Sequence, residues 1–258
     1  GALGALDKIE GYNNGDGITP APLTLQDYID AGIGGVSNAN LAAVNAQVLA
    51  APAGGANTGP EVNALVSAAN TALAKVEAFN NGDGSTPDAL TLADYQAIGV
   101  VGVSTDNLSS VNAKVLEQDG GGADSSPEVQ GIVDDLAAAI IKVEAYNNGD
   151  GTTPAPLTVQ DYLDAAITGV SSDNLIAVNV QVLASNSGET DSTVKIQTKV
   201  TLADNAIAKI EAYNNGDGSS PSALLIADYE AVGVTGVSAD NLVAVNAQVL
   251  SSATGETD

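Results

Sequence analysis

The chain contains no cysteine, methionine, histidine, arginine or tryptophan. Without cysteine it can form neither a disulfide framework nor a thiolate metal site. Without histidine, cysteine and arginine it lacks the usual general base, thiolate nucleophile and phosphate clamp of enzymes. Pairs of carboxylates can still hydrolyse glycosides, but the repeated unit described below is too small for a deep pocket, so no enzymatic activity is expected.

Aromatic and basic residues are also scarce. Aromatic residues make up 3% of the chain, and seven lysines face 32 acidic residues, which gives a formal net charge of −25. Phosphate binding needs clustered cations, so we expect no nucleic-acid partner and little attraction to anionic membrane surfaces. No apolar run of about 18 residues is present, so no membrane insertion is expected. The apolar content of 44% argues against disorder, and the cores must be built from Ala, Val, Leu and Ile.

What the sequence does contain is a ten-residue motif repeated at a period of 67 residues. It begins at Lys8, Lys75, Lys142 and Lys209, and its last copy reads Lys-Ile-Glu-Ala-Tyr-Asn-Asn-Gly-Asp-Gly. A fixed period decides the architecture before any local feature does. The predicted repeats cover residues 1–51, with a truncated first helix, and residues 52–118, 119–185 and 186–258. We expect the sequence to be a segment of a longer repetitive protein.

The second repeat, taken as a template, begins with a predicted long helix. Proline is favoured at the first helical position and an acidic residue suits the positive helix end, so Gly59-Pro60-Glu61 predicts the start. Apolar residues at helical spacing from Val62 to Phe79 predict a helix of roughly 20 residues. The helix is predicted to end at the following Asn-Asn-Gly, because Asn and Gly tolerate the left-handed conformation.

Two shorter helices are predicted to follow in the same repeat. The segment from Thr91 to Asp94 has the form of a capping box with Asp in place of Glu, and it begins a short helix that stops near Gly99. A serine is expected to cap a third helix, which ends near Leu116 in this repeat. The four capping serines are Ser37, Ser104, Ser171 and Ser238.

The expected fold class is therefore all-α, a tandem array of small three-helix-bundle repeats with a period of 67 residues. The linkers at 51–59, 119–126 and 185–191 are rich in Gly, Ser and Asp, which favours separate bundles on a semi-flexible string. The alternative is a continuous solenoid, in which each repeat buries apolar surface on the next.

The Asn-Asn-Gly-Asp-Gly loop after each long helix has oxygen ligands of the kind that calcium prefers, and glycine allows its sharp turn. In the third repeat, Asn148 and Asp150 would act with Asp161, and Glu144 lies one turn back. The spacing departs from an EF-hand loop, because Asp161 comes ten residues after Gly151 instead of six. The candidate calcium ligands of all four repeats are Asn14, Asp16, Asp27, Asn81, Asp83, Asp94, Asn148, Asp150, Asp161, Asn215, Asp217 and Asp228.

Ordinary turn and cap chemistry offers a second interpretation of the same residues. Asn-Gly and Asp-Gly are common in turns, and an Asp in the first turn of a helix is stabilising without a metal. In the fourth repeat Leu225 replaces the capping threonine although Asp228 remains, which favours a role for the acid beyond the cap. A calcium site and a plain helix connection both stay open.

Two further polar positions recur in all four repeats. The asparagines of the third helix are expected to hydrogen-bond the loops between helices, and a ligand role is the less favoured alternative. The tyrosines of the short helix are expected to belong to the core and its rim instead of forming a carbohydrate platform. These residues are Asn45, Asn112, Asn179 and Asn246, and Tyr28, Tyr95, Tyr162 and Tyr229.

The run from Ile210 to Gly218, followed by Ala-Asp-Tyr at 227–229 and by Gly-Val-Ser-Ala-Asp-Asn-Leu at 236–242, resembles the helical tandem repeats of very large bacterial surface proteins of the adhesin type. The resemblance covers all four repeats. It implies an extracellular location at the bacterial cell surface and a structural role, and it carries no binding residues with it.

Two functions are consistent with these features. The first is a structural extender or spacer region of a large extracellular surface protein, whose partners are the neighbouring repeats and, through self-association, a filament or matrix. The second is a multivalent module that binds a peptide or glycan weakly at each repeat and gains avidity from the array. The second function requires an exposed apolar or aromatic patch shared by the repeats.

Overall fold

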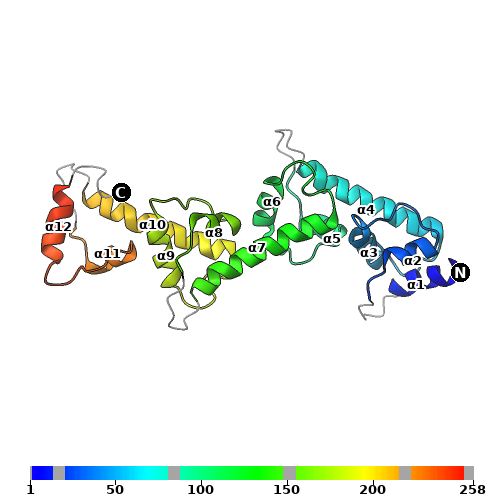
Figure 1. The fold of residues 1–258 in the computed structure, drawn as a ribbon, viewed down its shortest axis with the longest axis horizontal. Helices are drawn as coiled ribbons and strands as arrows, with labels where there is room; N and C mark the ends of the chain where they lie inside the picture. The colour runs from blue at the N-terminus through cyan, green and yellow to red at the C-terminus, as the bar shows by residue number, and fades with distance from the viewer. Residues whose placement is uncertain (1, 14–20, 81–87, 148–154, 215–221, 253–258) are drawn as a thin grey trace. The chain divides into compact units, whose positions relative to one another are not determined.

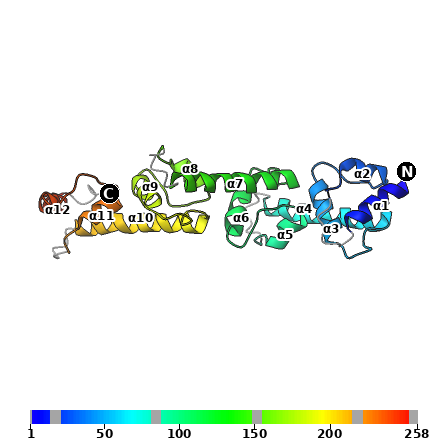
Figure 2. The same ribbon diagram turned by 90° about the horizontal axis from the view of Figure 1, so that it is seen from below.

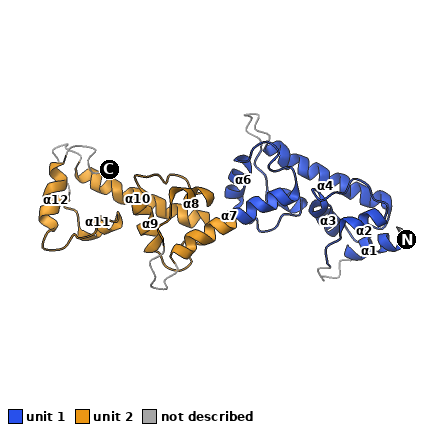
Figure 3. Ribbon diagram, viewed as in Figure 1, with its two compact units in different colours: residues 1–135 blue, residues 136–258 orange. Residues whose placement is uncertain are grey.

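The computed structural model describes residues 2–13, 21–80, 88–147, 155–214 and 222–252, and within these ranges it is helical without any strand (Figure 1). The all-α prediction is confirmed. The chain divides into two compact units, residues 1–135 and 136–258 (Figure 3). None of the helices in the described ranges has both the length and the apolar character that a membrane span requires.

Helices of three kinds follow one another in a fixed order. The first kind comprises α1 (Ala2–Tyr12), α4 (Gly59–Phe79), α7 (Ser126–Tyr146) and α10 (Thr193–Tyr213). The second kind is short and comprises α2 (Leu25–Asp30), α5 (Leu92–Ala97), α8 (Val159–Asp164) and α11 (Ile226–Ala231). The third kind comprises α3 (Leu41–Ala50), α6 (Leu108–Leu116), α9 (Leu175–Leu183) and α12 (Leu242–Ser251).

Local sequence signals account for the ends of the first two kinds of helix. Thr58 caps α4, and the Glu61 side chain accepts from the backbone N–H of Thr58 at 2.9 Å, so this helix has a full capping box. The predicted capping boxes with Asp are confirmed at α2, α5 and α8. Each short helix ends two residues before a position with positive φ, such as Gly99 after α5, whose φ is 74°.

The predicted serine caps of the third kind of helix are wrong. These helices begin at Leu41, Leu108, Leu175 and Leu242, four residues after the serines, and the residue at the N-cap is an asparagine. In the second repeat the Asn107 side chain accepts from the backbone N–H of Ser104 at 2.7 Å and donates to the carbonyl of Gly102 at 2.8 Å. The asparagine therefore closes the turn before the helix, and the serine supplies backbone groups to that turn. The same bonds form from Asn40, Asn174 and Asn241.

Within unit 2, one long helix belongs to two successive apolar clusters. The first cluster contains residues of α7, α8 and α9, and the N-terminal half of α10 completes it with Ile196, Val200 and Ala203. The C-terminal half of α10 supplies Ile210 and Tyr213 to the second cluster, which includes α11 and α12. Figure 2 shows α10 extending from beside α9 to beside α11. The first cluster thus crosses the polar linker at 185–191, as the solenoid alternative requires.

Unit 1 uses the same scheme. Helix α4 packs against α3 through its N-terminal half, where Val62, Val66 and Ala69 are buried, and against α5 further along. Helix α3 also contacts α5 directly. A polar bridge supports this contact, since the Gln47 side chain donates to the carbonyl of Ala97 at 2.9 Å. Apolar burial in this unit therefore also joins residues of two consecutive predicted repeats.

Candidate functional site

The candidate site is the connection between each first helix and the short helix that follows. It is centred on one aspartate in each repeat, and we call these four residues the joint carboxylates: Asp27, Asp94, Asp161 and Asp228. Their Oδ1 atoms accept from lysine Nζ atoms one helix earlier. The pairs are Lys8–Asp27, Lys75–Asp94 and Lys209–Asp228, each at 2.6 Å, together with Lys142–Asp161.

The second oxygen of each joint carboxylate stabilises the start of the short helix. The Oδ2 atom accepts from the backbone N–H of the N-cap residue at 2.8 Å in all four repeats. In the first three repeats it also accepts from the threonine hydroxyl, as at Thr24, at 2.8–2.9 Å. One side chain therefore links two helices and satisfies a backbone donor that would otherwise lack a partner.

These contacts lower the pKa of the joint carboxylates. At Asp27 the hydrogen bond from Lys8, followed by that from the Thr24 backbone, lowers the pKa to about 2. At the other three, partial burial raises the pKa, but the hydrogen bonds from the lysine and from the cap backbone outweigh it, so that the pKa of each is lowered. All four are ionised at neutral pH and interact as charged groups.

The ion pair explains why Asp228 is present in the repeat that lacks a capping threonine. Leu225 has no hydroxyl, yet its backbone N–H still donates to Asp228, and Lys209 binds the other carboxylate oxygen. The acid therefore has two partners that do not depend on the threonine. Its persistence in the fourth repeat needs no metal ion.

The structure describes only part of the predicted calcium site. The joint carboxylates are described, whereas the loop candidates Asn14, Asp16, Asn81, Asp83, Asn148, Asp150, Asn215 and Asp217 lie outside the described residues. Within the described ranges, no three acidic side chains come together as a potential metal site. Both oxygens of each joint carboxylate are engaged, so a cation bound there would compete with the lysine.

The first asparagine of the Asn-Asn-Gly sequence, which the sequence analysis did not single out, fastens the base of the same connection. The Asn13 side chain donates to the carbonyls of Val48 and Ala51 at the end of α3, at 2.5 and 2.8 Å. Asn80 and Asn147 make equivalent bonds to the ends of α6 and α9. These carbonyls lie in the last turn of the third helix or directly after it, where intrahelical donors are lacking. The bonds join the end of the first helix to the end of the third.

A buried tyrosine and asparagine form the interior of the connection. In each repeat the tyrosine hydroxyl donates to the asparagine Oδ1 at 2.6–2.7 Å. The asparagine Nδ2 in turn donates to a leucine carbonyl in the loop before the short helix at 2.8–2.9 Å. The predicted loop-bonding role of Asn45, Asn112, Asn179 and Asn246 is confirmed. Tyr28, Tyr95 and Tyr162 are fully buried and Tyr229 nearly so, which confirms their assignment to the core.

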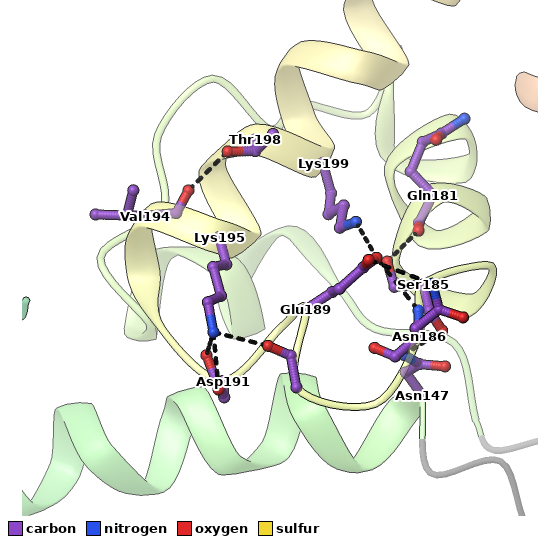
Figure 4. A network of polar contacts seen from close by, with 11 residues as sticks. Asn147, Gln181, Ser185, Asn186, Glu189, Asp191, Val194, Lys195, Thr198 and Lys199 are labelled. Carbon is purple, nitrogen blue, oxygen red and sulfur yellow. Dashed lines mark hydrogen bonds and ion pairs between the residues drawn. The ribbon is translucent and has the colours of Figure 1, made fainter.

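The junction between α9 and α10 has an additional polar network (Figure 4). Lys199 binds Glu189 at 2.9 Å, and this contact is the main reason that the pKa of Glu189 is lowered to about 2. Lys195 binds Asp191 at 2.7 Å and the carbonyl of Gly188 at 2.8 Å. With the pair Lys114–Glu117 and the four joint pairs, all seven lysines of the chain are ion-paired.

No protein family model, no curated protein and no solved structure matches this chain.

Proposed function

We propose that this chain is a structural extender, a spacer region of a large extracellular protein at the bacterial cell surface. In this proposal the 67-residue period corresponds to a three-helix repeat, and each long helix completes the core of the repeat before it. The observation that carries the proposal is α10, one continuous helix with Ile196 and Val200 in one apolar cluster and Ile210 and Tyr213 in the next. A helix shared in this way couples neighbouring repeats mechanically.

The polar contacts of the four repeats support the same function. The tyrosine–asparagine hydrogen bond recurs in every repeat at 2.6–2.7 Å, and every repeat also has its lysine–aspartate pair. An extender needs many equivalent units, whereas a catalyst or a receptor needs one differentiated site. The excess of acidic residues keeps such a chain soluble and limits non-specific association. The cell-surface location rests on the sequence resemblance to adhesin-type repeats.

The extender proposal is tested by changing the number of repeats. Chains with one or two additional 67-residue periods inserted in register would be compared with the natural chain by small-angle X-ray scattering. We expect the maximum dimension to increase by the same amount with each added period. A radius of gyration that follows the compact-protein scaling, about 18 Å for 258 residues, would contradict the extender function.

We further propose that calcium binds at the loop and the joint carboxylate of each repeat, with Asn148, Asp150 and Asp161 as the ligands in the third repeat. The test is thermal unfolding of the whole chain in chelator and in millimolar calcium, with magnesium as the control. A ligand at 100 times its Kd adds about 2.7 kcal/mol, which would raise Tm by about 5 °C or more. The Asp150→Ala variant should lose part of this rise.

A second variant distinguishes a calcium site that is blocked by the lysine from the absence of a calcium site. Lys142→Met removes the cation that occupies Asp161, so it should enhance the calcium response if Asp161 is a ligand. An unchanged midpoint in calcium for the natural chain and for Lys142→Met would identify the loop as a plain helix connection.

The alternative function, a multivalent module for a peptide or glycan, has one supporting feature. The leucine at the end of the third helix is about half exposed in all four repeats, at Leu49, Leu116, Leu183 and Leu250. A single leucine is an ordinary surface feature, and the recurrent tyrosines are buried, so the extender function is better supported. Saturable glycan or peptide binding that is lost when these leucines become serine would favour the alternative.

A further inference from the structure

The last helix of unit 2, α12, has an apolar face. In the described part of the chain, this face is less completely buried than the equivalent faces of α3 and α9. Val245 and Val249 of α12 are partly buried, whereas Val178 and Val182 at the same positions of α9 are fully buried. In unit 1, Val44 and Val48 of α3 are fully buried as well. The loop before α12 shows the same difference, since Val234 is 43% exposed and its counterpart Ile167 is 0% exposed.

At α3 and α9, the N-terminal half of the next long helix covers the equivalent apolar face. Helix α10 covers α9 with Ile196, Val200 and Ala203, all at most 1% exposed. Helix α4 covers α3 with a matching set, Val62, Val66 and Ala69. The covering helices thus place branched apolar residues four positions apart and a small residue three positions later, which is the spacing of one helix face.

A cavity lies at the corresponding place beside α12. It has a volume of about 340 Å³ and is lined mainly by apolar side chains, including Ile207, Ile210, Tyr229, Val232, Val245 and Val249. These residues come from α10, the region around α11, and α12. Ile210, Tyr229, Val232, Val245 and Val249 belong to the second apolar cluster or pack against it. Asp173, Ile176 and Ala177 around the start of α9 complete the lining, so the cavity lies between α9 and the second cluster and borders the apolar face of α12.

We propose that this face of α11 and α12 docks the N-terminal half of a long helix from a further repeat. The bound helix carries Val or Ile at two positions four residues apart and Ala or Leu three residues later. The inference rests on the proposed stacking of repeats, and it identifies the partner of the free face. Docking would bury the apolar lining of the cavity, which is the main source of affinity.

Polar groups set the register of the docked helix. In unit 2 the Gln197 side chain accepts from the backbone N–H of Thr168 at 3.1 Å and donates to its carbonyl at 2.9 Å. In unit 1 Gln130 makes the same pair of bonds to Val101. The equivalent residue near α12 is Thr235, one 67-residue period after Thr168, and it is exposed. A glutamine directly after the first branched residue of the docked helix would pair with Thr235.

A second copy of this chain is a poorer occupant than a further repeat. The segments with the required pattern in α4 and α10 already cover α3 and α9, and the matching residues of α7, Val129, Val133 and Leu136, are buried within the chain as well. Helix α1 corresponds only to the C-terminal half of a long helix, since Tyr12 aligns with Phe79 at its end. A second copy could therefore dock only by opening one of its own cores.

The experiment supplies the docking helix as part of the same polypeptide chain. A copy of residues 192–213 is attached after Asp258, which lies one period after Asp191, so that the added helix follows the natural linker. Hydrogen exchange of the α12 amides is measured with and without the addition. We expect exchange in α12 to slow by about tenfold or more, because closing the core stabilises this end of the unit. The matched control carries the same addition with the copies of Ile196 and Val200 replaced by aspartate.

Two substitutions on α12 locate the contact. Val249→Asp faces the cavity and should abolish the protection, whereas Val243→Asp lies on the other side of the helix, 82% exposed, and should leave it unchanged. The aspartate-bearing addition leaves the natural chain unaltered, so the result does not depend on how well Val249→Asp folds.

Three results would overturn the docking inference. They are unchanged α12 exchange with the added helix, equal protection from the aspartate-bearing control, and sedimentation of the natural chain as a dimer that Val249→Asp dissociates. The last result would assign the face to a second copy. A constant increase of the maximum dimension per added period would still support the extender function if docking failed, so the two proposals can fail separately.

Discussion

The buried hydrogen bond from Tyr162 to Asn179 joins the short helix α8 to α9 in the third repeat. We predict that Tyr162→Phe lowers the free energy of unfolding by about 1–3 kcal/mol, because it leaves the buried Asn179 oxygen without its donor. Chemical denaturation measures the change.

The control for this prediction is Tyr146→Phe. The equivalent position in the second repeat is already Phe79, and both side chains are buried, Phe79 in unit 1 and Tyr146 in unit 2. Tyr146→Phe should therefore leave the stability nearly unchanged. Equal effects of the two substitutions would show that the Tyr162 hydroxyl contributes nothing specific.

A second residue-level prediction concerns the position that follows each short helix. Ala166 has a φ of 57°, whereas the equivalent Gly32, Gly99 and Gly233 have φ between 73° and 85°. Side chains beyond glycine are strained there by about 1 kcal/mol. We predict that Ala166→Gly raises the free energy of unfolding by about 0.5–1 kcal/mol, measured by denaturant titration.

Two glycine-to-alanine substitutions distinguish the free-energy cost of backbone strain from the cost of a steric clash. A Cβ at Gly32 would meet no atom within 4 Å, so Gly32→Ala should cost about 1 kcal/mol from strain alone. A Cβ at Gly99 would lie 2.4 Å from the carbonyl oxygen of Ala42, so Gly99→Ala should cost clearly more than Gly32→Ala. Equal costs would mean that the approach of α3 to α5 adjusts freely.

At the scale of the helix, the joint carboxylate makes the start of α2 sensitive to acid. We predict that Asp27→Asn lowers the stability by about 1–2 kcal/mol at pH 7, since it weakens the cap and removes the ion pair with Lys8. The pKa of Asp27 is lowered from 3.8 to about 2 by folding. Its contribution is therefore complete above pH 4 and is lost as the pH falls toward 2.

The pH dependence is read from the difference between the natural chain and the variant, because other carboxylates titrate in the same range. That difference should shrink as the pH falls from about 4 to about 2. Thr24→Leu is the matched control, since the fourth repeat has Leu225 at this position. It should cost less than Asp27→Asn, and its cost should not vanish at low pH. A pH-independent difference for Asp27→Asn would exclude the charged interaction.

The continuity of α10 leads to a prediction for the helix as a whole. Asn205 is exposed and lies between the residues that serve the two apolar clusters. Asn205→Pro should cost about 3 kcal/mol or more, because proline removes a backbone bond and clashes with the preceding turn. We also expect hydrogen exchange to show the two clusters of unit 2 opening separately. Asn205→Ala should be neutral or slightly stabilising.

The helices show which parts of the structure local sequence can predict. The Pro-Glu start of α4 and the capping boxes from Thr to Asp act within four residues, so the sequence locates them well. The serine caps were wrong because Ser104 and Asn107 both can accept backbone donors, and only the position of Gly102 decides between them. The apolar stripe of α10 has one spacing along its length, so it cannot reveal that its two halves serve different cores.

Local sequence also explains why only part of the candidate site could be predicted. Asp27 and its equivalents were identified from their place in a capping box, but their lysine partners lie 19 residues earlier on another helix. No local rule pairs residues at that separation. The recurrence of both residues in all four repeats, Lys8 with Asp27 and Lys209 with Asp228, is the signal that could have found the pair.

At the scale of the whole molecule, the charge is almost entirely of one sign. All seven lysines are ion-paired, and the remaining excess is 25 negative charges. Self-repulsion of this excess opposes folding, and salt screens it, with a Debye length of about 10 Å at 0.1 M. We predict that Tm rises between 20 mM and 500 mM sodium chloride. A fall would mean that the screened ion pairs matter more than the repulsion.

The sharing of α10 between two apolar clusters also bears on how such a gene changes in length. Because each core draws on two consecutive periods, unequal recombination that gains or loses one full period leaves every remaining core with the same kinds of partner. A deletion of half a period would instead bring together two surfaces that never meet in the array. Length variants of the gene that persist should therefore differ by multiples of 67 codons, wherever in the period the recombination occurs.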